Sequence, residues 1–497
     1  MVQNKFRHLH PTTLLFNLLD VIKRFLIPGI LLIYFGGGRS YELFFMIFAF
    51  PALAISIINY LHFTYRLSEH ELIVKHGILN RRERHVPFHR IQNVDTRQNI
   101  LHRMLKVADA IIQTASGAEP EAELKVLSFE DIEYIRKQIF TDDRIVHKPP
   151  HHSTEDRIRD DERERRIIAR VPLRDLIMYG VISNRGMVVV AAAMGILYQF
   201  NVELIQRWFK ALPSFLNVLW SGSLISRSIA GAFVVVGAIV LLRLFSIFLA
   251  IITFYNFTLT RQKDELLVRY GLFTEHSLTI PISHIQRIEV ESTVLHRVFG
   301  FARIKARTAG TRSGEDSKQH YDHLIPIVEH SQIHQILNAI NPDIAYDYLE
   351  WKSVERRAIR RLFFKLTAFF AIPGLLLTYY YEWIGAVSWV IIFPLSFTLA
   401  YFQVKHMGFT FWEGTIWIKH GWLTRRMYSI RHEKIQSVSL LQTPFDRRLN
   451  MASVYVDTAN AGAQKLSTRI PYLYLNNALE IYNRLRQEAA DKHFEWS

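Results

Sequence analysis

Arginine is the residue whose repeated spacing most plainly offers chemistry in this sequence. A trio ending in arginine occurs three times, as Leu101-His102-Arg103, Leu295-His296-Arg297 and Phe445-Asp446-Arg447. A guanidinium group can hold a phosphate through paired hydrogen bonds, or it can bind backbone carbonyls and structural acids. The three arginines are therefore candidates for contacts with a lipid headgroup or a partner, with a structural ion pair or carbonyl contact as the alternative.

A second basic feature follows a glycine that is also repeated. The first copy has Arg81, Arg82 and Arg84, and the third copy has Arg425 and Arg426. The middle copy has Glu-His-Ser at 275–277 instead. An anionic headgroup site built on this cluster is thus expected in the first and third copies only.

Patterns typical of catalysis or metal binding are weak. The glycines at 310 and 314 lack the Lys-Ser/Thr pair of a phosphate-binding loop. His330 and His334 have the spacing of two metal ligands on one helix face, but no third ligand is evident. The chain contains no cysteine, which excludes thiol catalysis and cysteine metal sites. We expect a protein that is not an enzyme and carries no cofactor or metal.

These residues lie in a segment that occurs three times, which decides the architecture before any local feature does. In each copy a glycine stands at the same distance before an Ile-Gln pair: Gly77 and Ile91, Gly271 and Ile285, Gly421 and Ile435. The glycine is expected to end a strand at a turn where a positive φ is needed. The Ile-Gln pair is expected to supply a core residue and a turn-fixing amide.

Periodicity places the elements of each copy. Alternating polar and apolar residues predict strands at 71–76, 265–270 and 415–420. Apolar residues at helical spacing predict a closing helix at 129–140, 328–340 and 475–485. Several short antiparallel strands with one C-terminal helix describe a small barrel or sandwich. The expected fold class is an α+β membrane protein.

Six apolar stretches come in pairs, one pair before each copy, and each stretch is close to the roughly 20 residues that span a bilayer. A pair and its copy form the repeat unit. The expected organisation is a hairpin at 1–63, a module at 64–140, a charged linker at 141–174, a second hairpin at 175–254 with an outer interfacial segment at 202–220, a module at 255–345, a hairpin at 346–404 and a module at 405–497.

Arg243 is the one arginine in the middle of a long apolar run. An ionisable residue inside a membrane is a candidate functional residue. Pairing with another helix, or extension of its side chain towards the interface, is the structural alternative. A polar path between the hairpins would instead make the protein a component of a lipid or peptide transporter or exporter, which is the second functional hypothesis.

The net charge of +15 is typical of nucleic-acid binding or of domains that face an anionic leaflet. With apolar spans present we favour the second interpretation, and we expect no nucleic-acid partner. Basic residues such as Arg66, Arg261 and Lys405 flank the spans on the module side, whereas the connection at 381–383 has none. Because cytoplasmic flanks carry the excess of Lys and Arg, the modules and both termini are expected to be cytosolic.

The Gly, Ile-Gln and Leu-His-Arg pattern, placed after paired membrane helices and repeated three times, resembles the bacterial pleckstrin-homology-like membrane proteins of the YdbT-like type. The resemblance covers nearly the whole chain. It implies a pleckstrin-homology-like fold for each module, a bacterial plasma membrane, and a smaller YdbS-like partner with one such module. The expected role is a non-catalytic membrane scaffold in envelope protection or stress handling, which also contacts anionic lipids.

Overall fold

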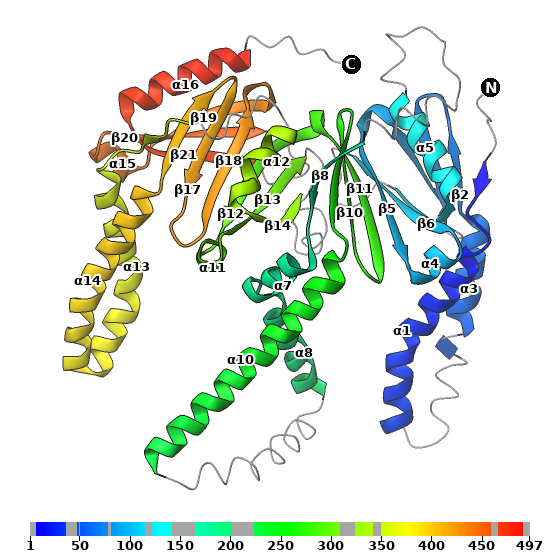
Figure 1. Ribbon diagram of the computed structural model, residues 1–497, viewed down its shortest axis with the longest axis horizontal. Helices are drawn as coiled ribbons and strands as arrows, with labels where there is room; N and C mark the ends of the chain where they lie inside the picture. Colours follow the sequence, from blue (N-terminus) through cyan, green and yellow to red (C-terminus); the bar gives the residue numbers. More distant parts are fainter. Residues whose placement is uncertain are drawn as a thin grey trace.

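Three modules stand in a row, each with a membrane hairpin extending from the same side (Figure 1). The computed structural model describes residues 6–35, 47–48, 50–77, 81–114, 122–141, 165–200, 223–308, 324–340, 349–458 and 466–490. The predicted interfacial segment at 202–220, the loop at 309–314 and most of the charged linker lie outside these residues.

The first module shows the order of elements that the other two repeat. Its elements are β1 (Arg7–His8), α1 (Thr13–Phe35), α3 (Phe50–His62), β2 (Thr64–Leu67), β3 (Glu71–His76), β4 (Arg82–Pro87), β5 (Ile91–Asn99), α4 (Ile100–Met104), β6 (Val107–Thr114), β7 (Ala122–Ser128) and α5 (Phe129–Thr141).

The second module inserts a broken helix into the same order. Its elements are β8 (Arg165–Arg170), α7 (Leu173–Ile182), α8 (Arg185–Phe200), α10 (Leu224–Phe254), β9 (Thr258–Gln262), β10 (Glu265–Tyr270), β11 (Thr274–Pro281), β12 (Ile285–Ser292), α11 (Val294–Val298), β13 (Phe301–Thr308), β14 (Ile325–Glu329) and α12 (Ile333–Ile340).

The third module has a hairpin that is described without a gap. Its elements are β15 (Lys352–Ser353), α13 (Ala358–Tyr380), α14 (Glu382–Lys405), β16 (Gly408–Trp412), β17 (Thr415–His420), β18 (Arg425–Arg431), β19 (Ile435–Leu441), α15 (Pro444–Arg448), β20 (Met451–Thr458), β21 (Leu466–Tyr474) and α16 (Leu475–Ala490).

Each module begins with a strand that precedes its membrane hairpin. β1 pairs with β2, β8 with β9 and β15 with β16, all antiparallel. The sequence pattern predicts that these segments belong to the hairpins or to the linker. The structure corrects that placement, since the hairpin is inserted between the first two strands and the sheet holds both of its ends.

The repeated glycine and the Ile-Gln pair have clear backbone roles. Gly77, Gly271 and Gly421 have φ of 105°, 120° and 91°, as the turn requires. A register shift falls at the glutamine of each Ile-Gln pair, between Ile91 and Asn93 and at the matching positions of the other copies. The glutamine is thus the extra residue of a β-bulge, a device that bends and twists a strand.

Sheets run across the module boundaries. One seven-stranded sheet has the order β7-β6-β5-β11-β10-β9-β8, and the other has the order β14-β13-β12-β18-β17-β16-β15. The second half of one module therefore shares a sheet with the first half of the next. The core of the second module even includes Trp417, which comes from β17 of the third module and is 1% exposed.

Apolar helices extend from the modules. Within the described residues, three helices are long and apolar enough to cross a membrane: Arg227–Phe254, Ala358–Tyr380 and Gly385–Lys405. A bent pair, Leu173–Ile182 with Gly186–Ala192, makes a fourth if it counts as one span, and Phe50–His62 is a shorter apolar helix. These helices agree with a membrane protein built on repeated hairpins.

Candidate functional site

The repeated arginine joins one module to the next. Arg103 Nη2 donates to the carbonyl oxygens of Leu272 at 2.6 Å and Phe273 at 3.4 Å. Arg297 donates from Nη2 to the Trp422 carbonyl at 2.9 Å and from Nη1 to the Leu423 carbonyl at 3.2 Å. In both cases the carbonyls belong to the turn after the repeated glycine of the following module. The arginine thus fixes the junction between two modules.

Each of these arginines lies on a short helix whose N-terminus is capped in the same way. Asn99 and Thr293 accept hydrogen bonds from the backbone N–H of His102 and His296. Thr443 and Asp446 form a reciprocal capping box, in which each side chain binds the other's backbone N–H. The same position is buried in all three copies, as His102, His296 and Asp446. The helix start is also capped in all three, so the change from His to Asp in the third copy keeps the cap and adds a carboxylate to it.

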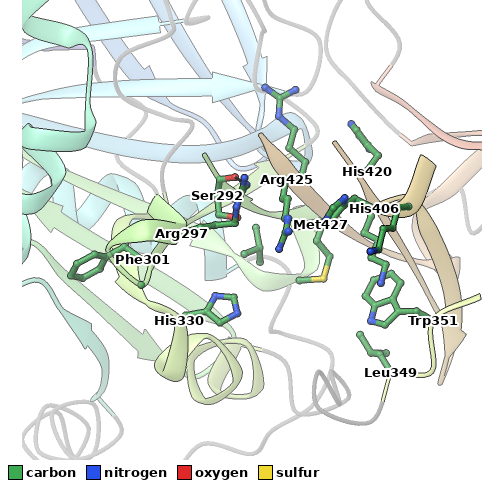
Figure 2. Close-up of a pocket in the computed structure, with 15 residues that line it drawn as sticks. Ser292, Arg297, Phe301, His330, Leu349, Trp351, His406, His420, Arg425 and Met427 are labelled. Carbon is green, nitrogen blue, oxygen red and sulfur yellow. Dashed lines mark hydrogen bonds between the residues drawn. The ribbon is translucent and has the colours of Figure 1, made fainter. Parts of the chain in front are cut away.

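A basic pocket lies at the junction of the second and third modules (Figure 2). Its cavity volume is about 700 Å³, and we call it the junction pocket. None of its lining residues is acidic, and most of them are basic or aromatic: Val290, Ser292, Arg297, Gly300, Phe301, His330, Leu349, Trp351, Lys405, His406, Lys419, His420, Arg425, Arg426 and Met427.

The cations of the pocket differ in their partners. Arg426 is paired with Glu291 at 3.5 Å and with Glu289 at 3.7 Å across the β12–β18 junction. Lys419 Nζ instead lies 4.2 Å from the ring centroid of Trp351. No acid within the described residues forms an ion pair with Lys419. This ammonium group therefore remains able to bind an added anion.

Arg425 is held by a histidine rather than by an acid. Its Nη2 donates to His406 Nε2 at 2.8 Å, and His406 Nδ1 donates to the Phe402 carbonyl at 2.7 Å. The carbonyl fixes the tautomer of His406, because the nitrogen that faces Arg425 must accept. His406 thus orients the guanidinium without neutralising it.

Crowding of like charges shows in the pKa values. Burial, followed by the charge of Arg425, lowers the pKa of Lys419 and that of Arg297. Both effects disfavour the charged forms of these groups. An anion bound in the pocket would reverse the second effect, so the electrostatics of the junction pocket favour a negatively charged ligand.

The pocket lies where a membrane helix ends. Lys405 is the last residue of α14, and His406 is its C-cap. Trp422, on the turn before β18, stacks on Phe402 of the same helix with ring centroids 5.2 Å apart. Tryptophan is enriched at the boundary between lipid and water. The pocket is therefore placed at the end of an apolar span.

The junction of the first and second modules keeps only part of this chemistry, since Arg103 and Arg269 match Arg297 and Lys419. At the positions that match Lys405, His406, Arg425 and Arg426, it carries Tyr255, Asn256, Glu275 and His276. A pocket in the first module, next to α4, is lined by both acidic and basic residues, including Asp20, Asp109 and Lys23. The excess of basic residues at 405, 406, 425 and 426 is thus a property of the second junction.

The other predicted arginines lie elsewhere. Arg82 and Arg84 are exposed on β4, with Arg81 just before it. Arg447 is exposed on α15. Only Arg297, Arg425 and Arg426 of the predicted set meet in one pocket, which they share with Lys419.

Arg243 binds a helix break. Its Nη1 donates to the Ser183 carbonyl at 3.0 Å and to Asn184 Oδ1 at 3.3 Å. Ser183 and Asn184 separate α7 from α8, where helical hydrogen bonds are interrupted. Ser246 also donates to the Ser183 carbonyl, at 3.0 Å. Arg243 therefore satisfies backbone groups that the bend leaves open, as expected for broken helices in a membrane.

Three residues of the junction pocket do not stand out in the sequence as candidate binding residues: Lys419, His406 and Trp351. They stand far apart in the chain and come together only because β17, the end of α14 and the segment before β15 meet at one junction. The available signal was the third copy's excess of basic residues at the positions matching Tyr255, Asn256 and Glu275.

His420 should make the third module sensitive to acid. Burial, followed by the charge of Arg426, lowers its pKa to about 4 from 6.5. As pH falls below 6.5 the unfolded chain binds a proton that the folded chain refuses, so stability is lost between pH 6.5 and about 4. His420→Tyr, the residue of the second copy at Tyr270, should remove a loss on the order of 3 kcal/mol. Thermal unfolding of the variant and the parent at pH 7 and pH 4.5 checks this, and an equal acid shift in both would refute it.

Comparison with known proteins agrees with this architecture. The family described as Bacterial PH domain matches residues 17–142, 211–344 and 362–489. A protein of Bacillus subtilis (strain 168), UPF0699 transmembrane protein YdbT, is 23% identical over 460 residues, which cover 89% of this chain and 90% of that protein. No solved structure matches. With three matches that together cover most of its length, this chain belongs to the bacterial PH domain family.

Proposed function

We propose that this protein is a non-catalytic, multi-pass membrane scaffold that binds an anionic lipid headgroup in its junction pocket and assembles with partner membrane proteins. Six spans place all three modules and both termini on the cytosolic side of a bacterial plasma membrane. Envelope protection or stress handling is the process in which such a scaffold would act.

The continuous sheets support a scaffold role. Backbone pairing between β5 and β11 and between β12 and β18 fixes each module against the next. Arg103 and Arg297 add side-chain contacts to the same junctions. A row of modules joined in this way presents its surfaces, and the hairpins below them, in a fixed arrangement. Such an arrangement suits the assembly of other membrane proteins.

The observation that carries the lipid proposal is the set of cations around the junction pocket at the end of α14. Lys419 and Arg425 have no acidic partner within the described chain, and Arg297 stands beside them. A phosphate group could accept hydrogen bonds from both an ammonium and a guanidinium here. Because the pocket begins where an apolar helix ends, the phosphate of a lipid reaches it without leaving the membrane surface.

The test is retention of phosphatidylglycerol by the full chain in nanodiscs of zwitterionic lipid doped with that lipid. Native mass spectrometry counts the bound molecules after gentle release. Hydrogen bonds between charged groups contribute about 1.5–3 kcal/mol each. Lys419→Gln/Arg425→Gln should therefore weaken retention by at least about tenfold.

Arg81→Gln/Arg82→Gln is the matched control, since it removes two positive charges from the edge of β4 and leaves the junction pocket intact. Equal losses in both variants would mean that only general surface charge attracts the lipid, and would refute the pocket. Competition by inorganic phosphate separates the two sources of the anion. Complete displacement at low concentration would assign the pocket to free phosphate rather than to a lipid.

A further inference from the structure

The two junctions between modules obey one pairing rule. β5 pairs with β11, with Gln98 opposite Glu275, and β12 pairs with β18, with Ser292 opposite Arg425. Ser292 matches Gln98 in the repeat, and Arg425 matches Glu275. The Ile-Gln strand of one module thus meets the strand after the repeated glycine of the next module in the same antiparallel register both times.

This rule leaves one free edge at each end of the row. Within the described strands, β4 ends the first sheet and β19 ends the last. β19 is the third copy of the strand that is covered in the other modules. Glu289 and Glu291 of β12 are buried, whereas Ser437 and Ser439 of β19 are exposed and Leu441 is 49% exposed.

The β4 edge is protected by charge. Arg82, Glu83, Arg84 and His85 are all exposed. Two of them have a partner on the neighbouring strand, with Lys75 Nζ 3.0 Å from Glu83 and His85 Nδ1 3.2 Å from Glu71. Exposed charges along an edge strand prevent it from pairing with another chain.

The strand that matches β4 in the second module is far less charged. The four positions are His276, Ser277, Leu278 and Thr279 in β11. Both β11 and β18 are paired across a junction, and the matching positions of β18 hold a single charged residue, Arg426, so the paired strands are less charged than β4. The β4 end of the row therefore carries the features of a terminus.

The β19 edge has no such protection. The strand from Ile435 to Leu441 contains no charged residue. In β12 the matching positions hold Glu289 and Glu291, which pair with Arg426 of the next module. An exposed edge strand of neutral and apolar residues is a template for pairing with another strand.

Arg447 marks the same end of the molecule. In the first two modules the matching Arg103 and Arg297 bind the turn of the following module. Arg447 is exposed, and no carbonyl in the described part of the chain accepts a hydrogen bond from its guanidinium. The third module thus carries both halves of a junction, the open strand and the arginine, and no described strand pairs with the open side of β19.

We propose that β19 binds the edge strand of one more module of this fold, carried by a separate polypeptide whose edge is uncharged like β11, with Arg447 donating to carbonyls of that module's turn. The register of the two internal junctions places position 84 of a β4-like strand opposite Ser439 and position 82 opposite Leu441. A second copy of this chain is disfavoured, because Arg82 and Arg84 would then face Leu441 and Ser439 without an acid. The inference extends the proposed scaffold role by naming the surface that takes the partner.

The chain itself can supply the probe. In the edge variant, the charged residues of β4 are replaced by those of β11 (Arg82→His, Glu83→Ser, Arg84→Leu, His85→Thr). The altered β4 of one molecule should then pair with β19 of another. Native mass spectrometry in detergent should show a single chain for the parent, and dimers or larger assemblies for the variant.

Adding Ser439→Lys/Leu441→Lys to that variant should return it to the single-chain mass. Asn483→Lys/Gln487→Lys, which adds the same charge at exposed positions of α16, should leave the assemblies intact. If the fourfold change lowers the unfolding temperature, the smaller Arg82→His/Arg84→Leu change repeats the test, because it removes the two arginines that would face Leu441 and Ser439 and keeps Glu83 and His85 with their partners.

Disulfide cross-linking measures the register of the proposed strand pairing. The printed sequence has no cysteine, so only the introduced cysteines can react. In the edge variant, cysteines at Ser439 and at position 84 (Ser439→Cys, Arg84→Cys) should form a disulfide between chains, and Ser437→Cys with Arg84→Cys should not. A folded edge variant that stays a single chain would overturn the proposal. Association of the parent chain through β19, reversed by Ser439→Lys, would overturn the assigned partner in favour of a second copy. Lipid retention is a separate readout, so failure here leaves the junction pocket untouched.

Discussion

Trp417→Ala should destabilise the junction of the second and third modules by about 3–5 kcal/mol, the usual cost of removing a large aromatic side chain from a core. Trp417 is 1% exposed and is the largest of the fully buried side chains. It comes from β17 of the third module but lies in the core of the second. Its loss would leave a cavity between two modules that share one sheet, and would loosen both.

Hydrogen exchange followed by mass spectrometry measures this effect by region. The variant should exchange faster in both β12 and β18, since the two strands are paired across the junction. Trp383→Ala is the matched control, because Trp383 is 73% exposed at the start of α14. Faster exchange confined to the third module would contradict a shared core.

Gly271→Ala should be the second largest single change. Gly271 has φ of +120°, and a Cβ at this position would overlap the carbonyl oxygen of Thr274 in the same turn. Backbone strain of this kind costs about 1–3 kcal/mol before the steric overlap is counted. The Leu272 carbonyl that Arg103 binds is the next residue, so the junction of the first two modules should weaken as well.

Gly300→Ala separates backbone strain from steric overlap. Gly300 also has a positive φ, +75°, but there is open space where its Cβ would lie. Thermal unfolding should show a clearly larger loss for Gly271→Ala than for Gly300→Ala. Equal losses would mean that the turn relaxes and that contact with Thr274 is unimportant.

The repeat allowed much of the fold to be predicted. Matching glycines before each Ile-Gln pair predicted a turn with positive φ, and Gly77, Gly271 and Gly421 confirm it. The closing helices expected at 129–140 and 475–485 are present as α5 and α16. Such features depend on neighbouring residues, and three copies of one pattern reinforce each other.

Contacts between distant segments could not be predicted. β1 and β15 have two residues each, too few for a periodic pattern, and a membrane hairpin separates each from the strand it pairs with. The pairing of β5 with β11 joins different copies, whereas a repeat pattern alone indicates separate modules.

The candidate site shows the same limit. Arg297, Arg425 and Arg426 stood out in the sequence as repeated or clustered arginines, but their meeting place depends on the β12–β18 junction. His406 and Lys419 join them only through that junction. Whether a basic residue completes a pocket or covers a surface is decided by sheet pairing, which local sequence does not encode.

The most direct test of the account is an electron cryomicroscopy map of the full chain in nanodiscs that contain phosphatidylglycerol. We predict density for a lipid phosphate in the junction pocket, within hydrogen-bond distance of Lys419 and Arg425, with its acyl chains running along α14. An empty junction pocket in a map that resolves these side chains, with lipid density at the β4 arginines instead, would contradict it.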